Sequence, residues 1–240
     1  MSQTAIVTGG TRGIGAAISV ALSEEGRKVA ATYAGNDEAA EAFKAQTGIS
    51  VYRFDVADFD ECADSVSRIE ADLGPVGILV NNAGITRDGT LHRMDFEQWN
   101  AVLQTNLSSC YNMCRNVIDG MRDRGFGRIV NIGSVNGQAG RYGQVNYAAA
   151  TSGIHGFTKA LALEGASRGV TVNAIAPGYV DTDMVRAVPE KVLEKIIATI
   201  PVGRLGYASD IARAVQFLVA DDATFITGST LSINGGQHMY

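Results

Sequence analysis

The stretch TAIVTGGTRGIG, residues 4–15, joins a short apolar run to a turn rich in glycine. The run is continuous in hydrophobicity, which is typical of a strand buried on both faces of a parallel sheet. Gly9, Gly13 and Gly15 let the backbone turn tightly and approach a pyrophosphate, whose charge meets the free N–H groups of a helix N-terminus. The stretch therefore predicts a nucleotide-binding turn, although a plain strand–helix connection has the same outline.

The same alternation of short apolar and longer amphipathic segments continues along the chain. Strands are predicted at 4–9, 28–33, 50–55, 77–82, 127–134, 170–178 and 229–235, and helices at 14–25, 36–47, 58–73, 96–122, 146–168 and 208–220. Repeated β-α-β units predict a doubly wound α/β (Rossmann) fold: a parallel sheet of about seven strands with helices on both faces. We expect one domain over residues 1–240, with ligands at the carboxyl ends of the strands.

Composition narrows the function class. The chain has 240 residues, 46% of them hydrophobic, and a net charge of −5, which argues against non-specific nucleic-acid binding. Three cysteines without a CxxC pair predict buried thiols and a reduced, cytoplasmic setting. The N-terminus resembles neither a signal peptide nor a membrane span, and three scattered histidines predict no metal site.

The end of the second strand bears on the choice of nucleotide. An acidic residue there would bind the adenosine ribose 2′-OH of NAD(H). This chain has Thr32-Tyr33-Ala34, with no acid before Asp37, and it has Arg12 in the glycine turn, placed to pair with a 2′-phosphate. NADP(H) is therefore favoured over NAD(H). Asp55 and Val56 are expected to flank the adenine, although Asp55 could instead cap the next helix.

Three polar features converge on the carboxyl edge of the predicted sheet. The fourth strand ends in NNAG (81–84), the fifth strand ends at Ser134, and Tyr147 begins a helix thirteen residues later. Taken singly, a turn, a strand-end hydroxyl and a half-buried aromatic explain them. The occurrence of all three features at one edge of the sheet is a more specific signal than any one of them alone.

These motifs, with Asn106 in QTNLSS and APG at 176–178, resemble the short-chain dehydrogenase/reductase family over the whole chain. Within it the sequence is most similar to the acetoacetyl-CoA reductases of polyhydroxybutyrate synthesis, on NNAGITRD, VNGQ, GQVNY, PGYVDTDMV and IPVGRLG. The 3-oxoacyl-acyl-carrier-protein reductases share most of these motifs, but the segment from VNGQ to GQVNY favours the CoA enzymes.

The resemblance implies roles for individual residues. Tyr147 would protonate a carbonyl oxygen during reduction by NADPH to an (R)-3-hydroxyacyl product, and Ser134 would hydrogen-bond that oxygen. Asn106 would hold a proton relay, with a structural, helix-kinking role as its alternative. The residues expected to contact NADP(H) are Gly9, Thr11, Arg12, Gly13, Ile14, Gly15, Tyr33, Asp55, Val56, Asn82, Ala83, Gly84, Ile85, Pro177 and Gly178.

The resemblance also implies a substrate region and an assembly. Asp88, Gln144 and Tyr179 would contact acetoacetyl-CoA or a similar 3-oxoacyl thioester, although loop polarity, a turn amide and a packing aromatic also explain them. PGYVDTDM and a helical stretch near 184–200 resemble a substrate lid near 179–205, and a static surface helix has the same pattern. A cytoplasmic homotetramer without nucleic-acid or membrane partners follows by resemblance.

Thr151 departs from the family pattern at its centre. The family has Tyr-x-x-x-Lys, whereas this chain has Tyr147-Ala-Ala-Ala-Thr151. In relatives the lysine binds the nicotinamide ribose, and its charge lowers the tyrosine pKa. A threonine supplies neither the charge nor the reach, and Lys159 is about 12 Å away along a helix. The chain is thus predicted to be a deliberately disabled variant of a working reductase or a natural homologue whose catalysis has faded, and nothing in the sequence supports another proton path. A non-catalytic NADP(H)-binding protein is the alternative function.

Overall fold

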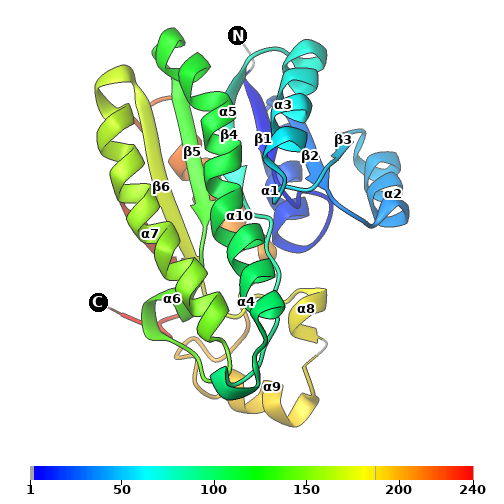
Figure 1. Cartoon of the computed structure of the whole chain (residues 1–240), viewed down its shortest axis with the longest axis vertical. Helices are drawn as coiled ribbons and strands as arrows, with labels where there is room; N and C mark the ends of the chain where they lie inside the picture. The colour runs from blue at the N-terminus through cyan, green and yellow to red at the C-terminus, as the bar shows by residue number, and fades with distance from the viewer. Residues whose placement is uncertain (1–2, 187, 240) are drawn as a thin grey trace.

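Seven parallel strands form one sheet at the centre of the molecule, in the order β3-β2-β1-β4-β5-β6-β7 (Figure 1). The computed structural model describes residues 3–186 and 188–239. The strands are β1 (Thr4–Val7), β2 (Lys28–Tyr33), β3 (Ser50–Arg53), β4 (Val76–Asn81), β5 (Gly127–Ile132), β6 (Val170–Pro177) and β7 (Thr230–Ile233). The predicted doubly wound sheet is confirmed.

The strand order reverses beside β1, which pairs with β2 on one side and with β4 on the other. Connections on the two sides of this point leave in opposite directions, which opens a crevice at the carboxyl ends of β1 and β4. The glycine turn follows β1 and the NNAG segment follows β4. Both motifs therefore lie where a doubly wound sheet binds its ligand.

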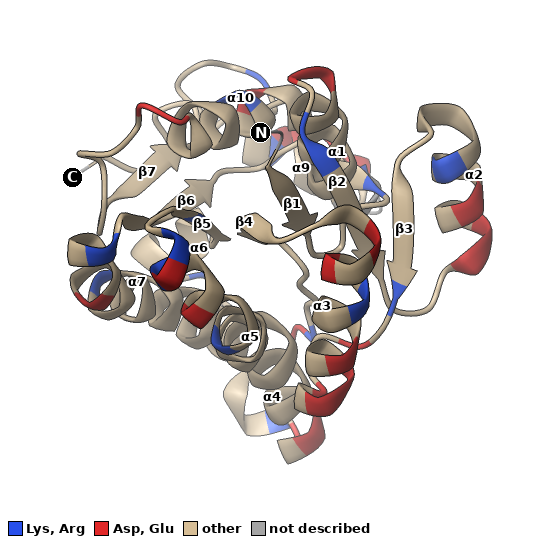
Figure 2. Cartoon of the chain, turned by 90° about the horizontal axis from the view of Figure 1, so that it is seen from above, with Lys and Arg blue, Asp and Glu red and all other residues tan. Residues whose placement is uncertain are grey.

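Helices cover both faces of the sheet (Figure 2). One layer holds α1 and α10, whose Ile18, Leu22, Ile211 and Val215 are buried in a single cluster. The other layer holds α3, α5 and α7, as the separate cluster beneath them shows. The helices are α1 (Gly13–Glu24), α2 (Asp37–Thr47), α3 (Phe59–Leu73), η1 (Leu91–Arg93), α4 (Phe96–Leu103), η2 (Gln104–Ser108), α5 (Ser109–Arg124), α6 (Val135–Ala139), α7 (Val145–Gly165), η3 (Ala166–Arg168), α8 (Asp183–Arg186), α9 (Glu190–Ile197) and α10 (Ala208–Val219).

Three helical regions differ from the prediction. The single helix predicted at 96–122 is interrupted by η2, a π-helical turn that contains Asn106. The helical stretch near 184–200 is divided into α8 and α9, because Pro189 precedes α9 and cannot continue a helix from α8. The short helix α6 directly follows Ser134 and was not predicted.

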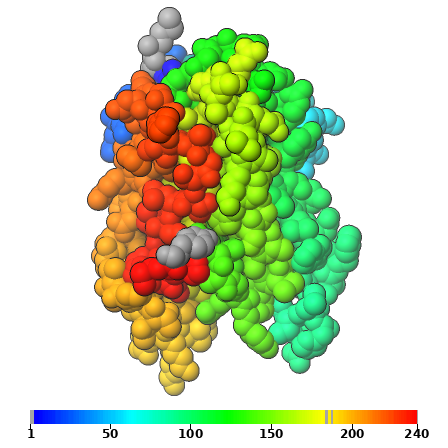
Figure 3. Space-filling view, turned by 90° about the vertical axis from the view of Figure 1, so that its left-hand side faces the viewer, coloured from blue at the N-terminus to red at the C-terminus, as the bar shows by residue number. Residues whose placement is uncertain are grey.

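The C-terminal strand β7 is the edge strand of the sheet beside β6, and α7 lies next to it on one face of the molecule (Figure 3). His155 of α7 and Thr230 of β7 share a hydrogen bond of 3.1 Å. Gln138 of α6 donates to the hydroxyl of Ser232 on the same strand at 3.1 Å. The two helices that follow Ser134 are therefore tied to the edge strand as well as to the neighbouring β6.

Candidate active site

The glycine turn has a backbone that side chains would obstruct. Gly9 and Gly13 have φ values of 61° and 53°, in the left-handed region that favours glycine. A Cβ on Gly15 would lie 2.1 Å from the carbonyl oxygen of Gly9. The turn thus keeps backbone N–H groups at the start of α1 open to a close neighbour, as a bound pyrophosphate requires.

The segment after β4 holds this turn in place. The Thr8 hydroxyl accepts hydrogen bonds from the backbone N–H groups of Asn82 and Ala83, at 2.9 and 3.0 Å. The Asn82 side chain donates to the Thr8 carbonyl at 2.9 Å. Asn82 and Ala83 were predicted to contact the cofactor, and the structure shows that they join the segment after β4 to the turn after β1.

Replacement of Gly15 by alanine is expected to disrupt the turn. Because the new Cβ would overlap the Gly9 carbonyl, we expect a loss of about 1–3 kcal/mol in unfolding free energy and weaker NADPH binding. Denaturant unfolding and cofactor titration would measure both quantities. Gly156→Ala is the matched control: nothing lies within 4 Å of its Cβ position, so in helix α7 it should stabilise by about 0.4–1 kcal/mol. Equal behaviour of the two variants would contradict this reading of the turn.

The expected adenosine end of the site is formed by β2, β3 and the start of α1. Asp37 forms an ion pair with Arg53 at 3.2 Å, and Arg53 also donates to the Ala34 carbonyl at 3.1 Å. The acidic residue nearest to β2 is therefore engaged by a cation that sequence reasoning missed. Burial is the main cause that raises the pKa of Tyr33, and a hydrogen bond with Asp37 raises it further. Arg12 is exposed at the N-terminus of α1, between the buried Thr11 and the Gly13-Ile14-Gly15 segment.

Asp55 does not cap the helix that follows it. Its carboxylate accepts from the backbone N–H of Ala57 at 2.9 Å, within the turn after β3. The cap of α3 is Asp58, which accepts from Asp60 and Glu61. The alternative interpretation of Asp55 as a helix cap was therefore wrong, and Val56 beside it is buried.

Asn106 lies in the π-helical turn and binds the backbone that follows NNAG. Its side chain accepts from Ile85 N and donates to Ile85 O, each at 3.0 Å. A Cβ on Gly84 would lie 3.4 Å from the Asn106 amide. Asn106 therefore positions the Gly84-Ile85 segment from within the helix interruption, and both its proposed relay role and its helix-kinking alternative stay predictions.

Ser134 and Tyr147 come together at the carboxyl edge of β5. Ser134 caps α6, where its hydroxyl accepts from the N–H of Asn136 at 3.1 Å. The residue Tyr147 is partly exposed. Burial raises the pKa of Tyr147, a hydrogen bond with Ser134 acts in the opposite direction, and the charge of Asp88 raises the pKa further. The two hydroxyls are thus within hydrogen-bonding reach.

Thr151 is buried and its hydroxyl is used within its own helix. The Thr151 Oγ1 donates to the Tyr147 carbonyl at 2.7 Å. Gly137 of α6 packs directly on this residue, since a Cβ there would lie 2.7 Å from Thr151 Oγ1. The residue at i+4 from Tyr147 therefore supplies neither a charge nor a hydrogen bond to the phenol, whose pKa is raised.

The three predicted substrate residues surround the mouth of this site. Gln144 Nε2 donates to Asp88 Oδ2 at 2.8 Å, and Asp88 is close enough to affect the pKa of Tyr147. Tyr179 also raises that pKa, and its ring lies 5.8 Å from the guanidinium carbon of Arg141. Asp88 and Gln144 are therefore joined by a hydrogen bond, and both Asp88 and Tyr179 raise the pKa of Tyr147.

Two residues beside the site escaped sequence reasoning. Asn146, fully buried next to Tyr147, donates to the Arg87 carbonyl at 2.9 Å and accepts from Tyr147 N at 2.8 Å. Thr182 packs on the glycine turn, 3.5 Å from a Cβ position on Gly13. The only sequence signals were an amide preceding the tyrosine and a hydroxyl four residues after Gly178.

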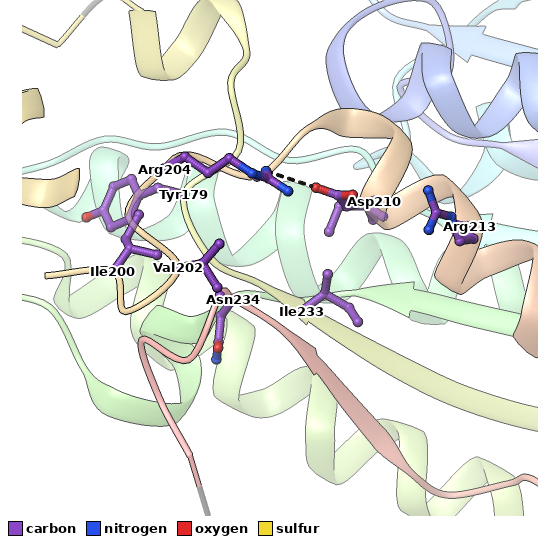
Figure 4. A pocket seen from close by; sticks show the side chains of 11 residues that line it. Tyr179, Ile200, Val202, Arg204, Asp210, Arg213, Ile233 and Asn234 are labelled. Carbon is purple, nitrogen blue, oxygen red and sulfur yellow. Dashed lines mark hydrogen bonds and ion pairs between the residues drawn. The ribbon is translucent and has the colours of Figure 1, made fainter. Parts of the chain in front are cut away.

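The base of the predicted lid encloses a cavity of about 290 Å³ (Figure 4). Gly178, which follows Pro177 at the end of β6, donates to the Ile233 carbonyl at 2.9 Å and leads into the lid. Tyr179, Ile200, Arg204 and Asn234 are among the residues that line the cavity. Neither Ser134 nor Tyr147 lines this cavity, whereas Tyr179 both lines it and raises the pKa of Tyr147.

The chain offers few groups for metal or thiol chemistry. Cys62, Cys110 and Cys114 are buried and free, as predicted, and burial raises the pKa of Cys62 and Cys110 to about 12. Over 3–186 and 188–239 no group of three His, Cys, Asp or Glu side chains could hold a metal ion. In the same two ranges, every helix is too short or too polar to cross a membrane.

Comparison with known proteins agrees with this geometry. A family model described as Enoyl-(Acyl carrier protein) reductase matches residues 9–238. The acetoacetyl-CoA reductase of Shinella zoogloeoides is 63% identical over 238 residues, and that of Rhizobium meliloti is 64% identical over 239, each covering 99% of both chains. A 3-oxoacyl-acyl-carrier-protein reductase of Escherichia coli is 47% identical over 239 residues, 99% of this chain and 98% of that protein. The chain therefore belongs to the short-chain dehydrogenase/reductase family.

Proposed function

We propose that this protein reduces acetoacetyl-CoA, or a similar 3-oxoacyl thioester, to the (R)-3-hydroxyacyl thioester, and that Thr151 impairs this activity. The observation that carries the proposal is the meeting of the Ser134 and Tyr147 hydroxyls beside Asp88 at the carboxyl edge of the sheet. The names of the relatives with 63% and 64% identity support the substrate class. By resemblance, the setting is polyhydroxybutyrate synthesis in the cytoplasm, and the assembly is a homotetramer.

The residues at the site suit reduction of a carbonyl group. A nicotinamide cofactor held at the glycine turn would supply the hydride that reduces the carbonyl carbon. Tyr147 holds the proton that the developing oxyanion needs, and Ser134 stabilises the same oxygen by a hydrogen bond. Because burial raises its pKa, the phenol is protonated at neutral pH. It is a weaker acid than a phenol beside a cation, so proton transfer is slowed rather than abolished.

NADP(H) is the proposed cofactor. The glycine turn is so tight that a Cβ on Gly15 would overlap the Gly9 carbonyl oxygen, and such a turn would let a pyrophosphate approach the N–H groups at the start of α1. At the end of β2, Asp37 is paired with Arg53, so it does not present an unpaired carboxylate to a ribose phosphate. Arg12 and Arg53 would instead offer two cations to the 2′-phosphate.

Arg12→Ala is expected to weaken NADPH binding by about 10- to 100-fold, since a hydrogen bond to a charged group contributes about 1.5–3 kcal/mol. NADH affinity should stay within about twofold, because NADH lacks the 2′-phosphate. Fluorescence titration of both cofactors measures the difference. Arg115→Ala, which removes an exposed arginine paired with Asp119 on α5, serves as the control. Equal NADPH and NADH affinities that Arg12→Ala leaves unchanged would contradict the cofactor assignment.

Two other functions compete with this proposal. A 3-oxoacyl-acyl-carrier-protein reductase is favoured by the relative from Escherichia coli, and a non-catalytic NADP(H)-binding role is favoured by Thr151. The test is NADPH consumption by the chain and by Thr151→Lys, with acetoacetyl-CoA and with the acyl-carrier-protein thioester. We expect the lysine form to turn over the CoA thioester with the higher kcat/KM. A preference for the carrier-protein thioester would favour the second function, and no turnover of either thioester would favour the third.

A further inference from the structure

A chain of side-chain hydrogen bonds runs from α6 to the loop that carries Asp88. Asn136 Nδ2 donates to Gln144 Oε1 at 2.8 Å, and Gln144 Nε2 donates to Asp88 Oδ2 at 2.8 Å. The first member, Asn136, lies two residues after Ser134, and its backbone N–H donates to the Ser134 hydroxyl. The chain therefore connects the Ser134 helix cap with two of the residues proposed to contact the substrate.

The direction of these bonds follows from the last member. An ionised carboxylate only accepts hydrogen bonds, so Gln144 must turn its NH₂ group toward Asp88. Its oxygen then faces Asn136, which must in turn present its own NH₂ group. Reversing the Gln144 amide would set its oxygen against the carboxylate. A side chain that donates at position 136 is therefore needed to hold Gln144 in this orientation.

The backbone on both sides of these side-chain hydrogen bonds is held by other contacts. Gly89 N donates to Gly143 O at 2.8 Å, and residues 89 and 144 form a parallel bridge. Asn146 secures the same loop at the Arg87 carbonyl. Because the loop is held without Asn136, loss of this side chain should release the Gln144 amide and not the loop itself.

We propose that Asn136 is a positioning residue that sets the orientation of Gln144 and Asp88 toward the acyl thioester. The inference rests on the proposed function, since it concerns the substrate of the same site. Asn136 keeps one N–H of Gln144 directed toward Asp88 Oδ2. The second N–H of Gln144 and the other carboxylate oxygen, Asp88 Oδ1, are then left to contact the ligand. Asn136 lies in α6, the short helix that Ser134 caps. This one helix would therefore align both the carbonyl oxygen that reacts and the thioester arm of the substrate.

Calorimetric binding of acetoacetyl-CoA to the chain in the presence of NADP⁺ tests this inference without turnover. Asn136→Asp replaces the donor by an acceptor of the same shape, and we expect the Kd of acetoacetyl-CoA to rise about fivefold or more. The matched control is Gln138→Glu in the same helix. It makes the same amide-to-carboxylate change, but its partner is the Ser232 hydroxyl, which can donate to it. This control should stay within about twofold, and so should the NADP⁺ affinity of both variants.

A double variant supplies the rescue that a merely structural role would not give. With Asn136→Asp and Asp88→Asn together, Gln144 can reverse, donating to the residue at 136 and accepting from the residue at 88. The combined loss should be smaller than the product of the two single losses. In a Thr151→Lys background, Asn136→Asp should raise KM more than it lowers kcat.

Several outcomes would overturn the inference. They are an unchanged Kd in Asn136→Asp, an equal loss in Gln138→Glu, or losses in the double variant that simply multiply. Failure of the proposed function looks different: the unsubstituted chain would not bind acetoacetyl-CoA at all, and Thr151→Lys would not reduce it. In that case the inference falls with the function on which it rests.

Discussion

Thr151→Lys is expected to raise the rate of acetoacetyl-CoA reduction by at least about tenfold, equivalent to roughly 1.4 kcal/mol of barrier, and up to about 10²–10⁴-fold. In the present chain burial raises the pKa of Tyr147, and the Thr151 hydroxyl is committed to the Tyr147 carbonyl. A cation about 4 Å from the phenol at an effective dielectric near 20 contributes roughly 4 kcal/mol before desolvation. Steady-state kinetics of the two proteins measure the gain.

The control for this substitution is Thr151→Met, which has comparable length and no charge. If methionine restored the rate as well as lysine, the deficit would lie in packing against Gly137 and not in charge. If the threonine form already matched the lysine form, position 151 would not be the site of the missing cation.

The pH profile supplies a second readout of the same change. The protonated phenol is the active acid, so activity is lost as pH rises through the pKa of Tyr147. Burial raises that pKa in the threonine chain, whereas a nearby cation lowers it by about 1–3 units. The alkaline loss of activity should therefore begin at a lower pH in Thr151→Lys than in the threonine chain.

Tyr147→Phe in the Thr151→Lys background is expected to reduce turnover by about 10²–10⁴-fold, because it removes the proton donor. NADPH affinity should remain within about twofold, since the glycine turn and Asn82 are untouched. The matched control is Tyr111→Phe on α5, which loses an exposed hydroxyl and keeps its ring stacked near Phe59. Turnover within tenfold of the Tyr147 parent would show that another group delivers the proton.

The strands were predictable because each parallel strand is buried on both faces. TAIV and GILV are continuous apolar runs, and they correspond to β1 and to most of β4. The π-helical turn was not predictable, because the apolar spacing of 96–122 does not distinguish a regular helix from one with an extra residue in a turn. The break at Pro189 could have been predicted from the sequence, since proline removes a helical donor, whereas the helical stretch near 184–200 was expected from resemblance to a substrate lid.

Residues of the site could be predicted where a single sequence motif determines the contact that they make. Ser134 and Tyr147 lie at the ends of elements whose periodicity is clear, so their meeting follows from topology. Asn146 and Arg53 were missed because their partners lie 16 or more residues away along the chain. Asn136 was missed although Gln144 is only eight residues away, because nothing in the local pattern shows that the two amides face each other. The Asn146 amide, for example, binds the carbonyl of Arg87, and no local pattern marks an amide that binds a distant backbone group.

The proposed reduction is tested most directly by the product that Thr151→Lys forms from acetoacetyl-CoA and NADPH, analysed by chiral chromatography beside the unsubstituted chain. We expect (R)-3-hydroxybutyryl-CoA from both proteins, in equal amount to the NADPH consumed, with the lysine form faster by at least about tenfold. A folded lysine form that binds NADPH but leaves acetoacetyl-CoA unchanged would contradict the proposed function.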